Sequence, residues 1–130
     1  MIRAAVTRRP PPPPEPAMVA QHDDIPAFEI VREDADDVVR VRVRGEVDIA
    51  NAFEMTRAVV AAGMEPPGRR VALDLSEVVY LDSTGVRALI DARSALDREL
   101  VLVRPSAPVR RVLELTRLVE TFTVLDDEDR

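Results

Sequence analysis

The sequence predicts an α/β domain with a mixed β-sheet of four to five strands, helices packed on one face, and the element order β-β-α-β-α-β-α-β. Short apolar runs alternate with longer segments at helical spacing after residue 28, which favours parallel strands joined by right-handed helical crossovers. The run Val38–Arg44 alternates Val with Arg, so one face of that strand is apolar and the other is polar. We therefore expect helices over the apolar face and a partly open opposite face.

A proline-rich, disordered arm is predicted over residues 1–27, ahead of a single domain over residues 28–130. Five consecutive prolines begin at Pro10. Such a stretch lacks amide donors and apolar bulk, which favours polyproline II or disorder. A proline-rich ligand is the functional alternative. The single histidine, His22, lies in this arm without companion ligands, so we expect no metal site.

The first half of the domain is expected to contain a hairpin and a helix. Strands over Phe28–Arg32 and Val38–Arg44 pair antiparallel, and Gly45 ends the second strand. A helix over residues 50–64 follows, and the Glu-Pro-Pro-Gly sequence after it stops that helix. Its apolar side chains form one stripe and an adjacent pair. The stripe is Phe53, Thr56, Val60 and Met64, and the pair is Met55 and Val59.

Two more strand–helix units and an edge strand are expected after the prolines. Each strand is a short apolar run, and each helix has apolar residues at helical spacing. The strands are Val71–Leu75, Leu100–Val103 and Phe122–Leu125. A loop over residues 76–82 precedes a helix over residues 83–98. Ser106 is suited to cap the third helix because its hydroxyl can accept an amide hydrogen bond.

Composition limits the classes of function. All 18 basic residues are Arg and the formal net charge is −6, which argues against nucleic acid or an anionic membrane as partner. Aromatic residues make up only 3%, so a stacking platform for bases is not expected. The chain has no Cys, and no apolar run approaches the ~18 residues of a transmembrane helix. We expect a cytoplasmic protein without cofactor or direct membrane insertion.

The motif Asp82-Ser83-Thr84-Gly85 stands where a strand-like run meets a helix-like one. A hydroxyl at Ser83 would lie exposed at a helix N-terminus, where unpaired amides favour a phosphate. Phosphoserine would add about −1.5 to −2 charges beside Asp82 and, if it lies near, Asp48. Gly85 would let a partner approach the helix start closely. The alternative left open by this chemistry is that Ser83 only caps the helix.

Two further aspartates have competing interpretations. Asp48 follows the second strand, where it could cap the helix over residues 50–64 or act in the site. Asp74 lies near the expected end of its strand and could pair with Asp82 as catalytic carboxylates of a small hydrolase. No metal, His or Lys partner for such a pair is evident in the sequence, so we expect no enzyme activity.

Three blocks of the sequence together resemble the STAS domain, and most closely the bacterial anti-sigma-factor antagonists. They cover roughly residues 28–125, and the middle block is the most specific. The blocks are Val41–Asp48, which ends in Gly-Glu-Val-Asp; Val71–Gly85, which contains Asp-Leu-Ser and Leu-Asp-Ser-Thr-Gly; and Leu100–Thr116.

The resemblance implies a function that composition does not show. In that family the unphosphorylated domain binds an anti-sigma factor, often a serine kinase, and a sigma factor is released. The kinase phosphorylates the Ser after the signature Asp, and a metal-dependent serine phosphatase restores binding. The matching acceptor is Ser83. The matching partner-binding residues are Asp48, Asp82, Thr84, Gly85, Arg87 and Asp91. The alternative is a STAS scaffold that docks constitutively, in a stress-signalling assembly or a lipid-transport complex.

Three features depart from the family pattern. The connection Asp97-Arg98-Glu99 lacks the usual glycine and is short, which suggests that the second helix ends early or differs in its last turn. Arg117 stands where the family commonly has Gly at the end of the third helix. If that position needs positive φ, Arg costs about 1 kcal/mol relative to Gly. The proline-rich arm also lies outside the pattern.

Overall fold

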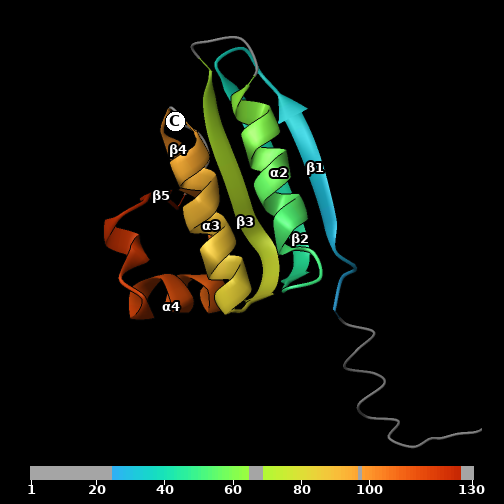
Figure 1. Cartoon of the computed structure of the whole chain (residues 1–130), viewed down its shortest axis with the longest axis vertical. Coiled ribbons are helices and arrows are strands. Elements are labelled where there is room, and N and C mark those ends of the chain that lie inside the picture. The colour runs from blue at the N-terminus through green and yellow to red at the C-terminus, as the bar shows by residue number, and fades with distance from the viewer. Residues whose placement is uncertain (1–24, 65–68, 97, 127–130) are drawn as a thin grey trace, which may run out of the picture.

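The computed structural model describes residues 25–64, 69–96 and 98–126, and these form a five-stranded mixed sheet with its helices on one face (Figure 1). In chain order the elements are β1 (Glu29–Asp34), β2 (Val38–Val47), α2 (Ala52–Gly63), β3 (Arg70–Leu81), α3 (Ser83–Ala95), β4 (Leu100–Val103), α4 (Ala107–Leu115), the 3-10 helix η1 (Leu118–Glu120) and β5 (Thr123–Leu125). The predicted fold class and element order are confirmed. The expected disorder of the arm concerns residues that lie almost wholly outside the described ones.

The sheet has the strand order β1-β2-β3-β4-β5. β1 pairs antiparallel with β2, as the predicted hairpin requires, and the remaining pairs are parallel. Parallel neighbours need crossover connections, and α2, α3 and α4 supply them. The carboxyl ends of β2 and β3 therefore lie side by side, and the starts of α2 and α3 follow from them.

The alternation of Val and Arg along β2 separates two different faces. Val39, Val41 and Val43 are fully buried in the main core beneath the helices. The Arg residues between them lie on the opposite face, where Arg40 pairs with Glu33 and Arg44 lies 3.6 Å from Glu29. A small second cluster of Ala72, Val101 and Val103 is also buried there. The expectation of helices over the apolar face is confirmed.

Both central strands run further than expected. Gly45 does not end β2; its φ of 98° lies in the left-handed region, and the register with β3 shifts beside it. A Cβ at this position would lie 2.9 Å from the carbonyl oxygen of Pro26, so glycine lets the preceding segment approach closely. β2 continues to Val47 and β3 to Leu81, in place of the predicted loop over residues 76–82.

Helix α2 buries a different side from the one expected, and α3 ends earlier than expected. On α2, Met55 and Val59 are fully buried, whereas Phe53 and Met64 of the predicted stripe are 70% and 80% exposed. The side of α2 that packs on the sheet carries Ala52, Met55, Val59 and Ala62, and this stripe has the same helical spacing as the predicted one. α3 ends at Ala95, earlier than residue 98, so the early-ending alternative for this helix is the correct one.

Helix α4 begins and ends as its sequence suggests. The Ser106 side chain accepts a hydrogen bond from the Val109 amide at 3.4 Å and donates one to the Val78 carbonyl oxygen. Ser106 is therefore the predicted cap, and it also ties α4 to β3. After α4, Arg117 adopts a φ of 64°, the left-handed conformation that favours glycine. None of the described helices has the length and hydropathy needed to cross a bilayer.

Candidate functional site

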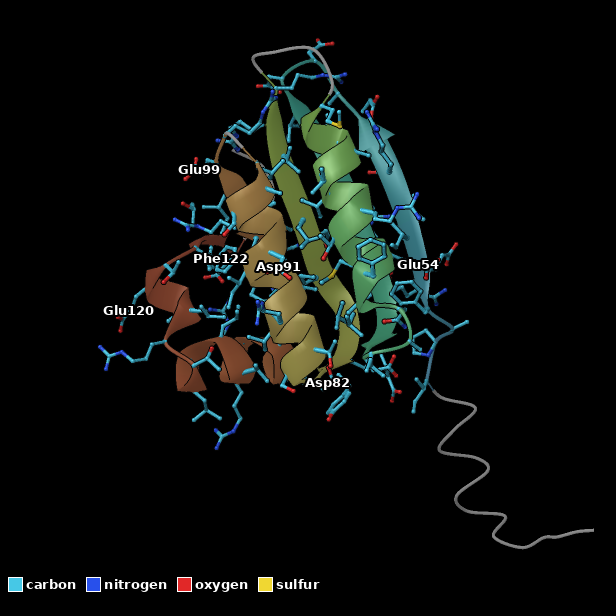
Figure 2. The ribbon with its side chains drawn as sticks, viewed as in Figure 1. Glu54, Asp82, Asp91, Glu99, Glu120 and Phe122 are labelled. Carbon is cyan, nitrogen blue, oxygen red and sulfur yellow. The ribbon has the colours of Figure 1, made fainter. Side chains whose placement is uncertain are left out.

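The candidate site forms where β2 and β3 end together. Val47 pairs with Leu81 in the parallel register, so the next residues, Asp48 and Asp82, emerge from neighbouring strands at one edge of the sheet. The Asp82 amide donates to the Val47 carbonyl oxygen at 3.3 Å. Figure 2 shows Asp82 at the start of α3, at this edge. The nearness of Asp48 to Asp82, which the sequence left conditional, is thus present.

Asp82 and Ser83 have separate roles at the start of α3. The Asp82 carboxylate accepts a hydrogen bond from the Gly85 amide at 2.9 Å, so Asp82 is the cap. Ser83 is the first helical residue and is exposed. Within the described part of the chain its hydroxyl makes no hydrogen bond, and the amides of Ser83 and Thr84 have no acceptor. The alternative in which Ser83 caps the helix is therefore wrong.

Asp48 organises the turn that leads into α2 and does not cap that helix. Its Oδ1 accepts a hydrogen bond from the Ala50 amide at 3.0 Å, and its carbonyl oxygen accepts from Asn51 and Ala52. Asn51 occupies the cap position, and its side chain bonds the Asp48 amide and the Glu46 carbonyl oxygen. This turn fixes Asp48 beside the start of α3 without using the second oxygen of its carboxylate.

Three carboxylates lie unneutralised at this edge. Glu46, Asp48 and Asp82 make no ion pair with any described residue. This contrasts with the face of the sheet opposite to the helices, called here the bare face, where acidic residues pair with Arg. Asp48 and Asp82 therefore place two unpaired carboxylates beside the exposed Ser83 hydroxyl, and Glu46 lies at the same end of β2.

Gly85 is buried, and its lack of a side chain serves packing within the domain. A Cβ on this residue would lie 2.5 Å from Leu81 Cδ1 and 3.2 Å from Val47 Cγ1. We expected Gly85 to let a partner approach the helix closely. The structure gives it another role, because it lets α3 approach the two central strands. A partner contact at Gly85 stays a prediction.

Arg87 and Asp91 continue the Ser83 face along α3. The three residues are spaced by four positions, which places them on one side of the helix. Arg87 Nε lies 3.1 Å from Asp91 Oδ1, and both side chains are exposed. Figure 2 shows Asp91 on the outward surface of α3. A partner that contacts Ser83 along the helix would therefore meet this pair.

Two exposed apolar residues at this edge were missed by sequence reasoning. Ile49 follows Asp48 and is 81% exposed, and Tyr80 precedes Leu81 and is 52% exposed. Their position in the β2–α2 turn and at the end of β3 places them beside the acidic residues. The available signal was an isolated Ile in a polar turn and the only Tyr of the chain.

Asp74 belongs to a different part of the molecule. It is fully buried, with its Oδ2 2.7 Å from Arg104 Nη2 and its Oδ1 accepting from the Ser76 amide at 2.9 Å. Burial alone would raise the pKa of this carboxyl, but the Ser76 amide and the Arg104 guanidinium outweigh it and hold the pKa below its ordinary value.

The structure does not bring Asp74 and Asp82 together. They are separated by the rest of an extended strand, roughly 25 Å at the usual rise per residue. The paired-carboxylate geometry of the hydrolase alternative is therefore not formed. Among the described residues, no group of three or more His, Asp or Glu side chains could hold a metal ion.

Fold and site together define a small α/β module that presents an unbonded hydroxyl at a helix start, at a sheet edge that also carries carboxylates and exposed apolar side chains. Residues 29–130 match the STAS domain family. BtrV of Bordetella bronchiseptica, named as an anti-sigma factor antagonist, is 33% identical over 90 residues, which are 67% of this chain and 77% of BtrV. The chain therefore belongs to the STAS domain family, in the group of anti-sigma factor antagonists, as the three blocks predicted.

Solved structures show the same relationship. An anti-sigma factor antagonist from Mycobacterium paratuberculosis superposes with a TM-score of 0.70 and 31% identity, covering 79% of this chain and 89% of that one. The Bacillus cell fate determinant SpoIIAA in its phosphorylated form has a TM-score of 0.55 and 19% identity, over 75% of this chain and 90% of that one. The likeness to SpoIIAA shows the fold alone.

Proposed function

We propose that this chain is a phosphorylation-controlled antagonist of an anti-sigma factor that is itself a serine kinase. Unphosphorylated, it binds that protein through the edge around Ser83, and a sigma factor is released. Phosphorylation of Ser83 ends the complex, and a serine phosphatase restores it. The observation that carries the proposal is the exposed Ser83 hydroxyl, which makes no bond within the described residues because Asp82 already caps the helix.

The local chemistry supports Ser83 as the acceptor. A kinase needs an accessible hydroxyl, and this one can be modified without removing a cap or a core contact. A phosphoryl group there would face the free amides of the first turn and the positive end of the helix dipole. We therefore expect the phosphorylated domain to stay folded, so that the modification acts on binding and not on stability.

The electrostatics explain how one phosphate could end binding. It would add about −1.5 to −2 charges beside the carboxylates of Glu46, Asp48 and Asp82. A partner surface fitted to the unmodified edge would have to accommodate this charge and its bulk at the centre of the contact. Mismatched charge across an interface costs several kcal/mol, which is enough to disrupt a complex of moderate affinity.

The acceptor is tested by incubating the protein with candidate anti-sigma kinases and labelled ATP. We expect label in the wild-type protein and none in Ser83→Ala. Ser94→Ala is the matched control, because Ser94 is an exposed Ser at the other end of the same helix, and it should be labelled fully. Label that persists in Ser83→Ala would refute the assignment.

The effect on binding is tested by calorimetry with the unmodified anti-sigma factor. Ser83→Asp should weaken binding at least tenfold, about 1.4 kcal/mol. Ser94→Asp adds the same charge to the same helix and should leave affinity nearly unchanged. Equal affinity of Ser83→Asp and the wild-type protein would count against a switch at this position and would favour constitutive docking.

A further inference from the structure

The side of α2 that faces away from the sheet carries exposed apolar side chains. Met55 and Val59 are buried in the core, so the opposite side of the helix points outward. There Phe53 is 70% exposed and Met64 is 80% exposed, which places both among the most exposed large apolar residues of the described part of the chain. They border a groove of about 660 Å³ that runs along α2 beside Ile30 of β1. An exposed apolar surface of this kind is typical of a docking site.

The spacing of residues on this surface is that of a helix-packing seam. The seam consists of four residues separated by four, three and four positions, as are the core positions of coiled coils. We call it the outer seam of α2, and its members are Phe53, Arg57, Val60 and Met64. The order of the separations is the same from either end, so a second α2 that runs in the opposite direction matches it. In that arrangement Phe53 lies opposite Met64 of the second copy, and Arg57 lies opposite its Val60.

The charges on this surface favour the antiparallel arrangement. Glu54 and Arg57 both line the groove, and Glu54 lies on the flank of α2 that faces β1 (Figure 2). Neither forms an ion pair with a described residue, and Arg57 lies over the Phe53 ring, 5.9 Å from its centroid. In a parallel pair of helices the two copies of Arg57 would lie side by side and repel each other.

Antiparallel pairing separates the two guanidinium groups. Each Arg57 side chain leans along its own helix toward Phe53, and so toward the C-terminal end of the other α2. The last turn of that helix has no basic residue, and a cation is favourable there. Glu54 lies toward the same end of the other helix, so one acid and one base enter the contact from each copy. The contact therefore has no net charge.

The length of the seam is suited to a dimer of modest affinity. α2 has 12 residues and is about 18 Å long, so two such helices would pack over roughly three turns. A pair of helices of this length buries at most about 1,200 Å², which is the low end of specific interfaces. On the neighbouring α3, Arg87 and Asp91 pair with each other and add no net charge to this side of the molecule. A dissociation constant on the order of 10–100 µM is therefore expected.

We infer that the outer seam of α2 is a self-association surface, on which a second copy of this chain docks with its own α2 antiparallel across a twofold axis. Phe53 of each copy then covers Met64 of the other at both ends of the contact. Arg57 and Val60 lie near the twofold axis. Such an isologous contact uses the same surface twice and stops at two copies.

Sedimentation equilibrium of the full chain, at concentrations from about 10 µM to about 1 mM, tests this inference. We expect monomer at the lower end and a growing share of dimer at the upper end. Phe53→Ser with Met64→Ser should weaken association at least tenfold, and the domain should fold normally because both side chains are exposed. Leu115→Ser is the matched control, since Leu115 is 70% exposed on α4 and should leave association unchanged. A chain that is monomeric throughout, or a double variant that associates like the wild-type protein, overturns the inference.

Disulfide crosslinking tests the direction of the helices. The chain has no Cys, so one can be introduced in each copy. Oxidation of Phe53→Cys mixed with Met64→Cys should give the mixed disulfide dimer, and either variant alone should give much less. The mixed dimer keeps one intact contact between Phe53 and Met64 on the other side of the twofold axis. Crosslinking that is as strong within either variant alone would show a parallel or non-specific contact and overturn the antiparallel docking.

Discussion

Asp82 and Ser83 divide two tasks that one side chain at a helix start could perform alone. Asp82 accepts the Gly85 amide and so carries the stability of the cap, which is typically worth about 1 kcal/mol. Ser83 is thereby left without a structural bond among the described residues. The sequence left capping and modification as rival interpretations of Ser83. The structure separates them onto two adjacent residues, so a change at Ser83 need not destabilise α3.

Tyr80 is expected to be a main contact of the binding edge. Half-exposed aromatic residues beside a recognition site are typical energetic anchors of interfaces. Tyr80→Ala should weaken binding to the anti-sigma factor at least tenfold, about 1.4 kcal/mol. Its free energy of unfolding should change by less than about 0.5 kcal/mol, because the side chain is not part of the core.

Met64→Ala serves as the control for Tyr80. Met64 is also apolar and exposed, but it lies at the opposite end of α2 from the Asp48 turn. Calorimetry should therefore show unchanged affinity for this variant. Similar losses in both variants would mean that the binding edge does not centre on Ser83.

Asp74 makes stability depend on pH in an acidic window. Its folded-state pKa is lowered from an ordinary value of 3.8, so its carboxylate stabilises the fold above that pH and the contribution is lost as pH falls through the folded pKa. Asp74→Asn should lower the free energy of unfolding by about 1–3 kcal/mol near neutrality. The difference from wild type should stay constant down to about pH 5 and shrink at lower pH.

Denaturant unfolding at a series of pH values measures this difference. Asp91→Asn provides the matched control, since it removes one carboxylate from an exposed pair whose contribution is small. A difference for Asp74→Asn that stays constant to the lowest pH at which the protein folds would contradict the assigned role of its charge.

At the scale of elements, the end of α4 shows a backbone conformation that its residue does not favour. Arg117 has a φ of 64°. Arg117→Gly should therefore raise the free energy of unfolding by about 1 kcal/mol. Arg111→Gly makes the same chemical change inside α4 and should lower it by about 1 kcal/mol. Chemical denaturation of both variants measures these changes. If both variants are destabilised, the contacts of the Arg117 side chain stabilise the fold by more than its backbone conformation costs.

Periodicity located the elements but could not always choose their buried side. On α2, the Phe53 stripe and the Met55 stripe both repeat at helical spacing, and only packing on the sheet selects the Met55 stripe. The sequence predicts that Gly45 ends a strand, because glycine is compatible with either a strand end or a bulge. The bulge requires the neighbouring chain near Pro26, a long-range contact that no local pattern contains.

The candidate site was predictable where residues follow one another and less so where strands meet. The sequence indicated Ser83 at a helix start, because an apolar run gives way to a helical one there. It could not show that Asp48 and Asp82 are adjacent, since this depends on the register of Val47 with Leu81. Ile49 and Tyr80 were missed for a related reason: exposure of an apolar residue is set by what packs over it.

At the scale of the whole molecule, the two faces of the sheet have different uses. The helix face holds the core and the connections. The bare face is lined by alternating acids and Arg, among them Arg42, which lies 3.7 Å from Asp74. The candidate site around Ser83 lies at one end of the sheet, where β2 and β3 finish. A partner that binds at Ser83 and along the Arg87–Asp91 side of α3 would leave the bare face of the sheet uncovered.

The unneutralised carboxylates at the site edge have a consequence for kinetics. The unpaired charges of Glu46, Asp48 and Asp82 add to one another and give this end of the sheet a local negative field. A basic partner surface would be steered toward this end, and its association would slow as ionic strength rises. Under the proposed function, a phosphate on Ser83 would strengthen that steering. The loss of affinity would then come from the bulk and the unaccommodated charge of the phosphate inside the closed contact, so dissociation would be faster while encounter is as fast as before or faster.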